Sequence, residues 1–245
     1  MPTKRTFAPS LAATLATLVM VPLLSSLGVW QLHRAQEKRA LAELAAAGER
    51  NTVELTAVSL PQLNRYQRVK VQGRYESKRQ ILLDNMPSQS GAPGYRVLTP
   101  FMLADAHMIL VDRGWVPLGR SRAELPDIDL PDNAAPVTIA GTVDRVPQPG
   151  VRLGTPEIGN TWPQVLSFPR YEDLQRIYGP MLLESIVLLD RAEPFGFERS
   201  RPQAQSGFGP ERHVGYAVQW FGLALTVLII YVAVNLKRRS GDDRA

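Results

Sequence analysis

The chain has 245 residues, a formal net charge of +5, three histidines and no cysteine. Without cysteine, this sequence has no disulfides, thiolate zinc sites, cysteine-bound iron–sulfur clusters or cysteine nucleophiles. Four of the five excess positive charges lie in the short terminal stretches 1–6 and 237–245. The remainder of the chain is nearly neutral, so nucleic-acid binding is not expected.

Two long runs without a charged residue lie near the two ends, at 7–32 and 214–236. As helices they would extend roughly 39 and 35 Å, which is enough to cross a hydrocarbon core of about 30 Å. The second run has aromatic residues near both ends and is followed by three basic residues, as in a spanning helix. The first run follows two basic residues, like a signal peptide, but its length favours an uncleaved anchor. Both runs are predicted to be transmembrane helices in the lipid bilayer.

The charge of the tails also predicts an orientation. Basic residues favour the cytoplasmic side, so residues 1–6 and 237–245 are predicted to be cytoplasmic tails. Residues 33–213 then form an outward-facing domain. In a bacterium this predicts the inner (plasma) membrane and the periplasm. In an organelle it predicts the mitochondrial inner membrane and the intermembrane space.

The domain between the spans is predicted to be mainly β (α+β). Residues 35–50, rich in Ala, Glu, Leu and Arg, favour a helix that leaves the membrane, and 193–211 have the composition of a linker. Residues 68–75 alternate between two faces, as in a half-buried strand. Further strands are predicted at 81–83, 95–103, 108–116, 137–143, 165–168 and 185–189, with a short helix at 171–178. Short strands with little helix indicate an antiparallel barrel or sandwich with one helix packed on it.

Catalytic and nucleotide-binding motifs are missing from the sequence. It has no G-x-G-x-x-G fingerprint, no Walker A loop and no G-x-S-x-G elbow. The acidic residues fall at predicted strand ends, where solvated carboxylates are the usual finding. The protein is therefore not expected to be an enzyme. An enzyme acting at the outer face would need a redox cofactor or an acid–base pair, and the sequence reveals neither.

The histidines are the candidate metal ligands. His33 follows the first apolar run and His213 precedes the second, so an antiparallel helix pair would bring both to the outer membrane face. A neutral imidazole there could bind haem iron, with the macrocycle against apolar helix sides. The alternative is an interfacial side chain that hydrogen-bonds to headgroups or to a loop. His107 is expected to be solvated in a hairpin turn.

Five short patterns follow one another along the chain. The first closes the first apolar run, the next three lie on predicted strands, and the last opens the second run. They are Gly28-x-Trp30-Gln31-Leu32-x-Arg34, Val69-x-Val71-x-Gly73-x-Tyr75, Gly94-Tyr95-x-Val97-x-Thr99-Pro100-Phe101, Ile109-Leu-Val-Asp-Arg113-Gly114-Trp115-Val116-Pro117 and His213-x-x-Tyr216-Ala217-x-x-Trp220-Phe221. In this order they resemble the surfeit locus protein family, which assists assembly of haem–copper cytochrome c oxidase.

The resemblance implies an assembly factor that binds haem a transiently and assists its insertion into oxidase subunit I. It implies haem a synthase as a further candidate partner and His213 as the iron ligand. Family members often carry Asn two residues before this histidine, where this chain has Glu211. The alternative function is a membrane scaffold that stabilises oxidase subunits without binding haem.

Five other motif residues are candidate haem contacts. Trp30 and Trp220 could flank the macrocycle or serve as interfacial anchors, and Tyr216 is a further candidate contact. Arg34 and Arg113 could pair with haem propionates, because a guanidinium matches a carboxylate. A fold-stabilising role is the favoured alternative for Arg113. The glycines of the strand motifs are expected to permit turns or close backbone approach.

Overall fold

The computed structural model describes residues 5–88, 90–131, 135–148, 158–199 and 209–238. The chain divides into two compact units, one formed by residues 1–41 and 205–245 and the other by residues 42–204. The elements, in chain order, are β1 (Arg5–Phe7), α1 (Leu11–Arg50), β2 (Thr52–Glu54), η1 (Leu60–Gln62), β3 (Arg68–Tyr75), η2 (Ser77–Arg79), β4 (Ile81–Leu83), β5 (Gly94–Leu103), β6 (Met108–Pro117), β7 (Val137–Arg145), β8 (Gln164–Leu166), α2 (Tyr171–Tyr178), β9 (Leu182–Leu189), α3 (Pro210–Asn235) and β10 (Leu236–Arg238).

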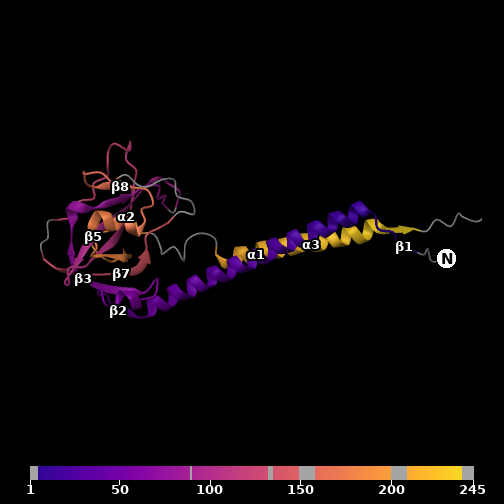
Figure 1. Cartoon of the computed structure of the whole chain (residues 1–245), viewed down its shortest axis with the longest axis horizontal. Coiled ribbons are helices and arrows are strands. Elements are labelled where there is room, and N and C mark those ends of the chain that lie inside the picture. Colours follow the sequence, from indigo (N-terminus) through magenta and orange to yellow (C-terminus); the bar gives the residue numbers. More distant parts are fainter. Residues whose placement is uncertain (1–4, 89, 132–134, 149–157, 200–208, 239–245) are drawn as a thin grey trace, which may run out of the picture. The chain divides into compact units, whose positions relative to one another are not determined.

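The first unit is an antiparallel pair of long apolar helices. By length and composition, α1 and α3 could each cross a membrane. They lie side by side (Figure 1), and side-chain hydrogen bonds join them near both ends of the pair. The helix predicted at 35–50 is confirmed as the continuation of α1. The linker predicted at 193–211 extends too far, because α3 begins at Pro210, and proline suits the first turn of a helix. Its part at 200–208 lies outside the described residues.

Mostly small residues lie where the two helices meet, and Leu24 is the exception. Leu24 and Gly28 on α1 and Ala217 and Ala224 on α3 are buried, whereas most of their neighbours along each helix are exposed. Their spacing of four or seven residues places each set along one helix face. Small side chains let helix backbones approach closely, which is the usual way in which helices pack in lipid.

The second unit is a five-stranded barrel. The strands follow one another in the order β3–β7–β9–β6–β5, and a pairing between β3 and β5 closes the ring. Four of the five contacts are antiparallel, and β6 and β9 are parallel. The predicted barrel is therefore confirmed, with a mixed rather than purely antiparallel sheet. A parallel pair needs a long connection, and the chain between β6 and β9 supplies one that includes α2.

Two large apolar clusters hold the barrel together, and a smaller third cluster joins β4, β5 and β6. One cluster takes buried residues from all five barrel strands, including Val71, Val111 and Val187. The other contains Leu98, Leu110 and the α2 residue Leu174, and it joins β4, β5, β6 and β9 to the helix that covers them (Figure 1). β6 is buried on both faces because its residues alternate between these two clusters.

Two glycines allow backbones to meet within this unit. A Cβ atom at Gly73 would lie 2.2 Å from the Met102 carbonyl oxygen, so glycine is required where β3 pairs with β5. Gly114 in β6 has a φ of +112°, a conformation that other residues rarely adopt. Its Cβ would lie 2.7 Å from the Glu198 carbonyl oxygen, where the segment after β9 crosses β6. The predicted close approach is confirmed at both positions.

Candidate functional site

A single hydrogen bond connects the first and last sequence motifs. Nδ1 of His213, in the first turn of α3, lies 2.8 Å from Oε1 of Gln31 on α1. Both side chains are half-buried. An amide oxygen has no hydrogen to donate, so the contact requires the proton of the imidazole to reside on Nδ1. Nε2 then carries the free lone pair, and this nitrogen can bind a metal.

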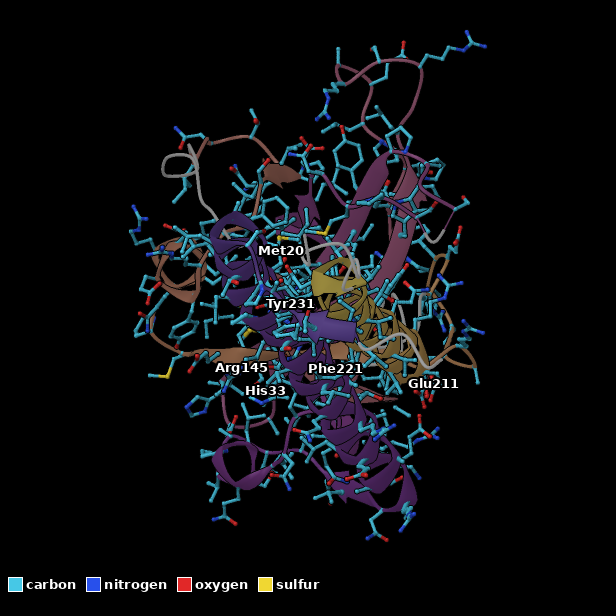
Figure 2. All side chains as sticks on the ribbon, turned by 90° about the vertical axis from the view of Figure 1, so that its right-hand side faces the viewer. Met20, His33, Arg145, Glu211, Phe221 and Tyr231 are labelled. Atoms are coloured by element: carbon cyan, nitrogen blue, oxygen red, sulfur yellow. The ribbon has the colours of Figure 1, made fainter. Side chains whose placement is uncertain are left out.

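The two helices also pack closely next to the contact between His213 and Gln31. Gly28 lies one turn before Gln31 on α1 and packs directly against the ring of Phe221, which is labelled in Figure 2. A Cβ atom at Gly28 would lie 2.7 Å from Cζ of that ring, nearer than ordinary van der Waals contact allows. The absence of a side chain at Gly28 therefore sets the separation of the helices beside the His213–Gln31 pair.

A second set of hydrogen bonds fixes the other end of the helix pair. Asn235 is almost completely buried, and its Oδ1 accepts a bond of 3.0 Å from the backbone N–H of Ser10. The hydroxyls of Thr14 and Tyr231 lie 3.0 Å apart, and Phe7 packs edge-on against the Tyr231 ring. These contacts fix the register of the two helices and hence which residue faces His213.

The other predicted residues of α1 form a separate exposed group. The guanidinium carbon of Arg34 lies 5.6 Å from the centroid of the Trp30 ring, one helical turn away. Arg34 also donates to Glu37 at 2.8 Å. The Trp30 side chain is 50% exposed, and His33 is exposed as well (Figure 2). His33 is not brought into the contact between His213 and Gln31.

The predicted residues of α3 share one helix face. His213, Tyr216 and Trp220 are separated by three and four residues, so they follow one another along the same side of α3. Tyr216 is 44% exposed, and Trp220 is half-buried. Glu211 lies exposed in the first turn of α3 (Figure 2), where a carboxylate interacts favourably with the helix dipole.

Arg113 lies in the core of the barrel unit. Only 2% of this residue is exposed, and its Nη1 donates to the carbonyl oxygen of Ile128 and to Oε1 of Gln80, both at 2.8 Å. Its Nε donates to the carbonyl oxygen of Phe195 at 2.7 Å. Burial among neutral oxygen atoms lowers the pKa of Arg113 to about 10. These contacts connect three segments of one domain, which favours the fold-stabilising interpretation. A propionate contact for Arg113 stays a prediction.

The roles of Gln31 and Asn235 were not predicted from the sequence. Each is an amide within a long apolar run, and that isolation is the signal that could have identified them. A polar side chain in such a run can hydrogen-bond to the neighbouring helix if it faces that helix. Its partner depends on the register of the two helices, which the sequence does not specify.

A barrel domain inserted between two apolar helices defines a class of membrane-associated protein. The two candidate membrane helices suggest a membrane location. Among the described residues, no three His, Asp or Glu side chains gather into a group that could hold a metal ion. The candidate site is thus one imidazole with a free Nε2 at the end of a helix pair, together with aromatic residues of the same helix.

The chain belongs to the SURF1 family, whose model matches residues 18–225. It is 29% identical to a SURF1-like protein of Rickettsia felis, over 89% of this chain and 94% of that protein. It is 27% identical to a SURF1-like protein of Rickettsia conorii, over 90% of both chains. It is 26% identical to Surfeit locus protein 1 of Takifugu rubripes, over 90% of this chain and 96% of the fish protein. Members of the SURF1 family are known as cytochrome oxidase assembly factors, and such factors are generally not enzymes.

Proposed function

We propose that this protein assists assembly of haem–copper cytochrome c oxidase by binding haem a transiently and aiding its insertion into subunit I. One observation carries the proposal: Nδ1 of His213 is engaged by Gln31, which leaves Nε2 as the metal-binding nitrogen. Haem a synthase is the proposed source of the haem.

Ligation by one imidazole suits a cargo that must be released. A haem supplies four nitrogen ligands of its own, so one axial histidine is enough to hold the iron. The described residues contain no cluster of His, Asp or Glu that would retain a bare metal ion. His213 is also only half-buried, so an acceptor protein could approach the iron as the haem leaves.

The surroundings of His213 provide surfaces for the rest of a haem. Tyr216 and Trp220 share its helix face, and an aromatic ring could stack on the macrocycle. Trp30 and Arg34 are the proposed contacts from α1, with the guanidinium available to a propionate. A propionate would compete with Glu37, the exposed partner of Arg34.

The proposed location is the bacterial inner membrane, or the mitochondrial inner membrane in an organelle. The basic tails at residues 1–6 and 237–245 would be cytoplasmic, and residues 33–213 would face the periplasm or the intermembrane space. His213 and Gln31 would then lie at the outer surface of the bilayer. A haem bound there could keep its charged propionates in water. Placing a charged propionate in lipid would cost more free energy.

An absorption spectrum tests the proposal directly. The full chain is produced together with the enzymes that make haem a and is then purified in detergent. Wild-type protein should carry the spectrum of haem a, and H213A should retain at most about one tenth of the haem per chain, which corresponds to about 1.4 kcal/mol of lost binding free energy. H33A is the matched control and should load like wild type, because His33 is two residues from Gln31 and therefore lies on nearly the opposite face of α1.

Two outcomes would contradict parts of the proposal. If H213A carries as much haem as wild type, His213 is not the ligand. If wild-type protein is colourless but co-purifies with subunit I, the protein is a scaffold that does not bind haem.

A further inference from the structure

Gln31 is a polar residue that the apolar helix α1 places at the candidate site. We infer that Gln31 is a positioning residue: its amide oxygen fixes the His213 imidazole in the Nδ1–H tautomer and presents Nε2 to the haem iron. This inference rests on the proposed function. Its physical basis is the 2.8 Å contact between Nδ1 and Oε1, which joins two helices far apart in the sequence.

The tautomer matters because only an unprotonated nitrogen binds iron. Free histidine in water prefers the tautomer with the proton on Nε2, which would block that nitrogen. An acceptor held against Nδ1 reverses the preference and also restricts rotation of the ring. Metal-binding histidines generally donate the proton of the other ring nitrogen to an oxygen atom for these reasons.

The position of Gln31 is set by the packing of the helix pair. Gly28, one turn earlier on α1, is in contact with the Phe221 ring, and the contacts of Asn235 fix the register at the far end. Gln31 is thus held against His213 by contacts other than its own hydrogen bond. A haem site with one protein ligand depends strongly on such an arrangement, because no second ligand orients the ring.

Two substitutions separate the acceptor from the volume of the side chain. Q31L has nearly the same size and removes the acceptor, whereas Q31E keeps an acceptor oxygen. Q219L is the matched control, because Gln219 is an exposed glutamine on α3. All three variants are made in the full chain and purified in the same detergent as wild type.

The first measurement needs no haem. Nitrogen-15 NMR of labelled histidine distinguishes the two imidazole tautomers, and the His213 signals are assigned by their loss in H213A. Wild type, Q31E and Q219L should show His213 protonated on Nδ1. Q31L should shift the population towards the Nε2–H tautomer. An unchanged Nδ1–H population in Q31L would overturn the inference.

The second measurement uses haem-loaded protein. Resonance Raman spectra of the ferrous form report the stretching frequency of the bond between iron and histidine, which falls when the Nδ1 proton loses its acceptor. Q31L should have a lower frequency than wild type and a haem affinity lower by about 10- to 100-fold. Q31E should match or exceed the wild-type frequency, and Q219L should match wild type.

The outcomes distinguish this inference from the proposed function. If wild type binds haem through His213 and Q31L keeps the wild-type frequency and affinity, Gln31 is not a positioning residue, although the proposed function stands. If wild type binds no haem, or H213A binds it equally well, the proposed function is wrong and the inference is wrong with it.

Discussion

The contact between Gly28 and the Phe221 ring allows a quantitative prediction about the helix pair. In G28A the new methyl carbon would lie 2.7, 2.8 and 3.0 Å from three atoms of the ring. Carbon atoms in contact are about 3.5–4.0 Å apart, so the ring or the helices would have to move by roughly 1 Å. Overpacking of this kind lowers stability by about 1–3 kcal/mol. The higher helix propensity of alanine offsets at most about 1 kcal/mol of that loss.

A larger side chain at this position should therefore separate the helices. We expect G28L to destabilise the helix pair by about 3 kcal/mol, at the upper end of the overpacking range. The double variant G28L/F221A should recover at least about 1 kcal/mol, because removal of the ring makes room for the leucine. G222L is the matched control, because a Cβ atom at Gly222 would meet nothing within 4 Å.

The assay is unfolding of the full chain in mixed micelles by titration with sodium dodecyl sulfate. All variants are made in a W115F/W162F background, so that tryptophan fluorescence comes from Trp30 on α1 and Trp220 on α3 and not from the barrel unit. The detergent concentration at which half of the protein is unfolded should be lower for G28L than for wild type. It should rise again for G28L/F221A and stay near the wild-type value for G222L. Equal midpoints for G28L and G222L would refute the close packing at Gly28, and so would a double variant no more stable than G28L.

Two further predictions concern the barrel unit and the far end of the helix pair. R113K keeps a positive charge but loses the branched set of donors that reaches Ile128 and Phe195. The free energy of unfolding of the barrel should therefore fall by about 2–3 kcal/mol, measured by thermal unfolding. An unchanged melting temperature would contradict this. In F7C/L236C the two cysteines replace directly paired residues of β1 and β10, at a separation that suits a disulfide. Oxidation should therefore give a monomer that migrates faster on a non-reducing gel. If the oxidised double variant migrates like the single-cysteine variants, the pairing of β1 with β10 is wrong.

The helices and several strands could be predicted from local sequence patterns. The charge-free runs identified both apolar helices, and the strict alternation of residues 68–75 gave the bounds of β3. These predictions succeed because a helix in lipid and a half-buried strand each impose a period on the sequence. β6 carries no such alternation, because it is buried on both faces, and its composition alone indicated a strand.

Pairing between distant segments could not be predicted in the same way. The parallel contact between β6 and β9 depends on the path of the intervening chain. The short pairings of β1 with β10 and of β2 with β3 were not predicted, because three residues carry too little periodicity. For the candidate site, the sequence indicated His213, whereas Gln31 became significant only when the register of the helices placed its oxygen beside Nδ1.

The most direct test of the central claim is the haem a content of subunit I in cells. The oxidase is purified from a strain that lacks this protein and from the same strain supplied with wild type, H213A or H33A, each produced at equal levels. Wild type and H33A should restore haem a to subunit I, and H213A should leave it close to the level of the deficient strain. Full restoration by H213A would show that delivery of haem does not depend on this imidazole.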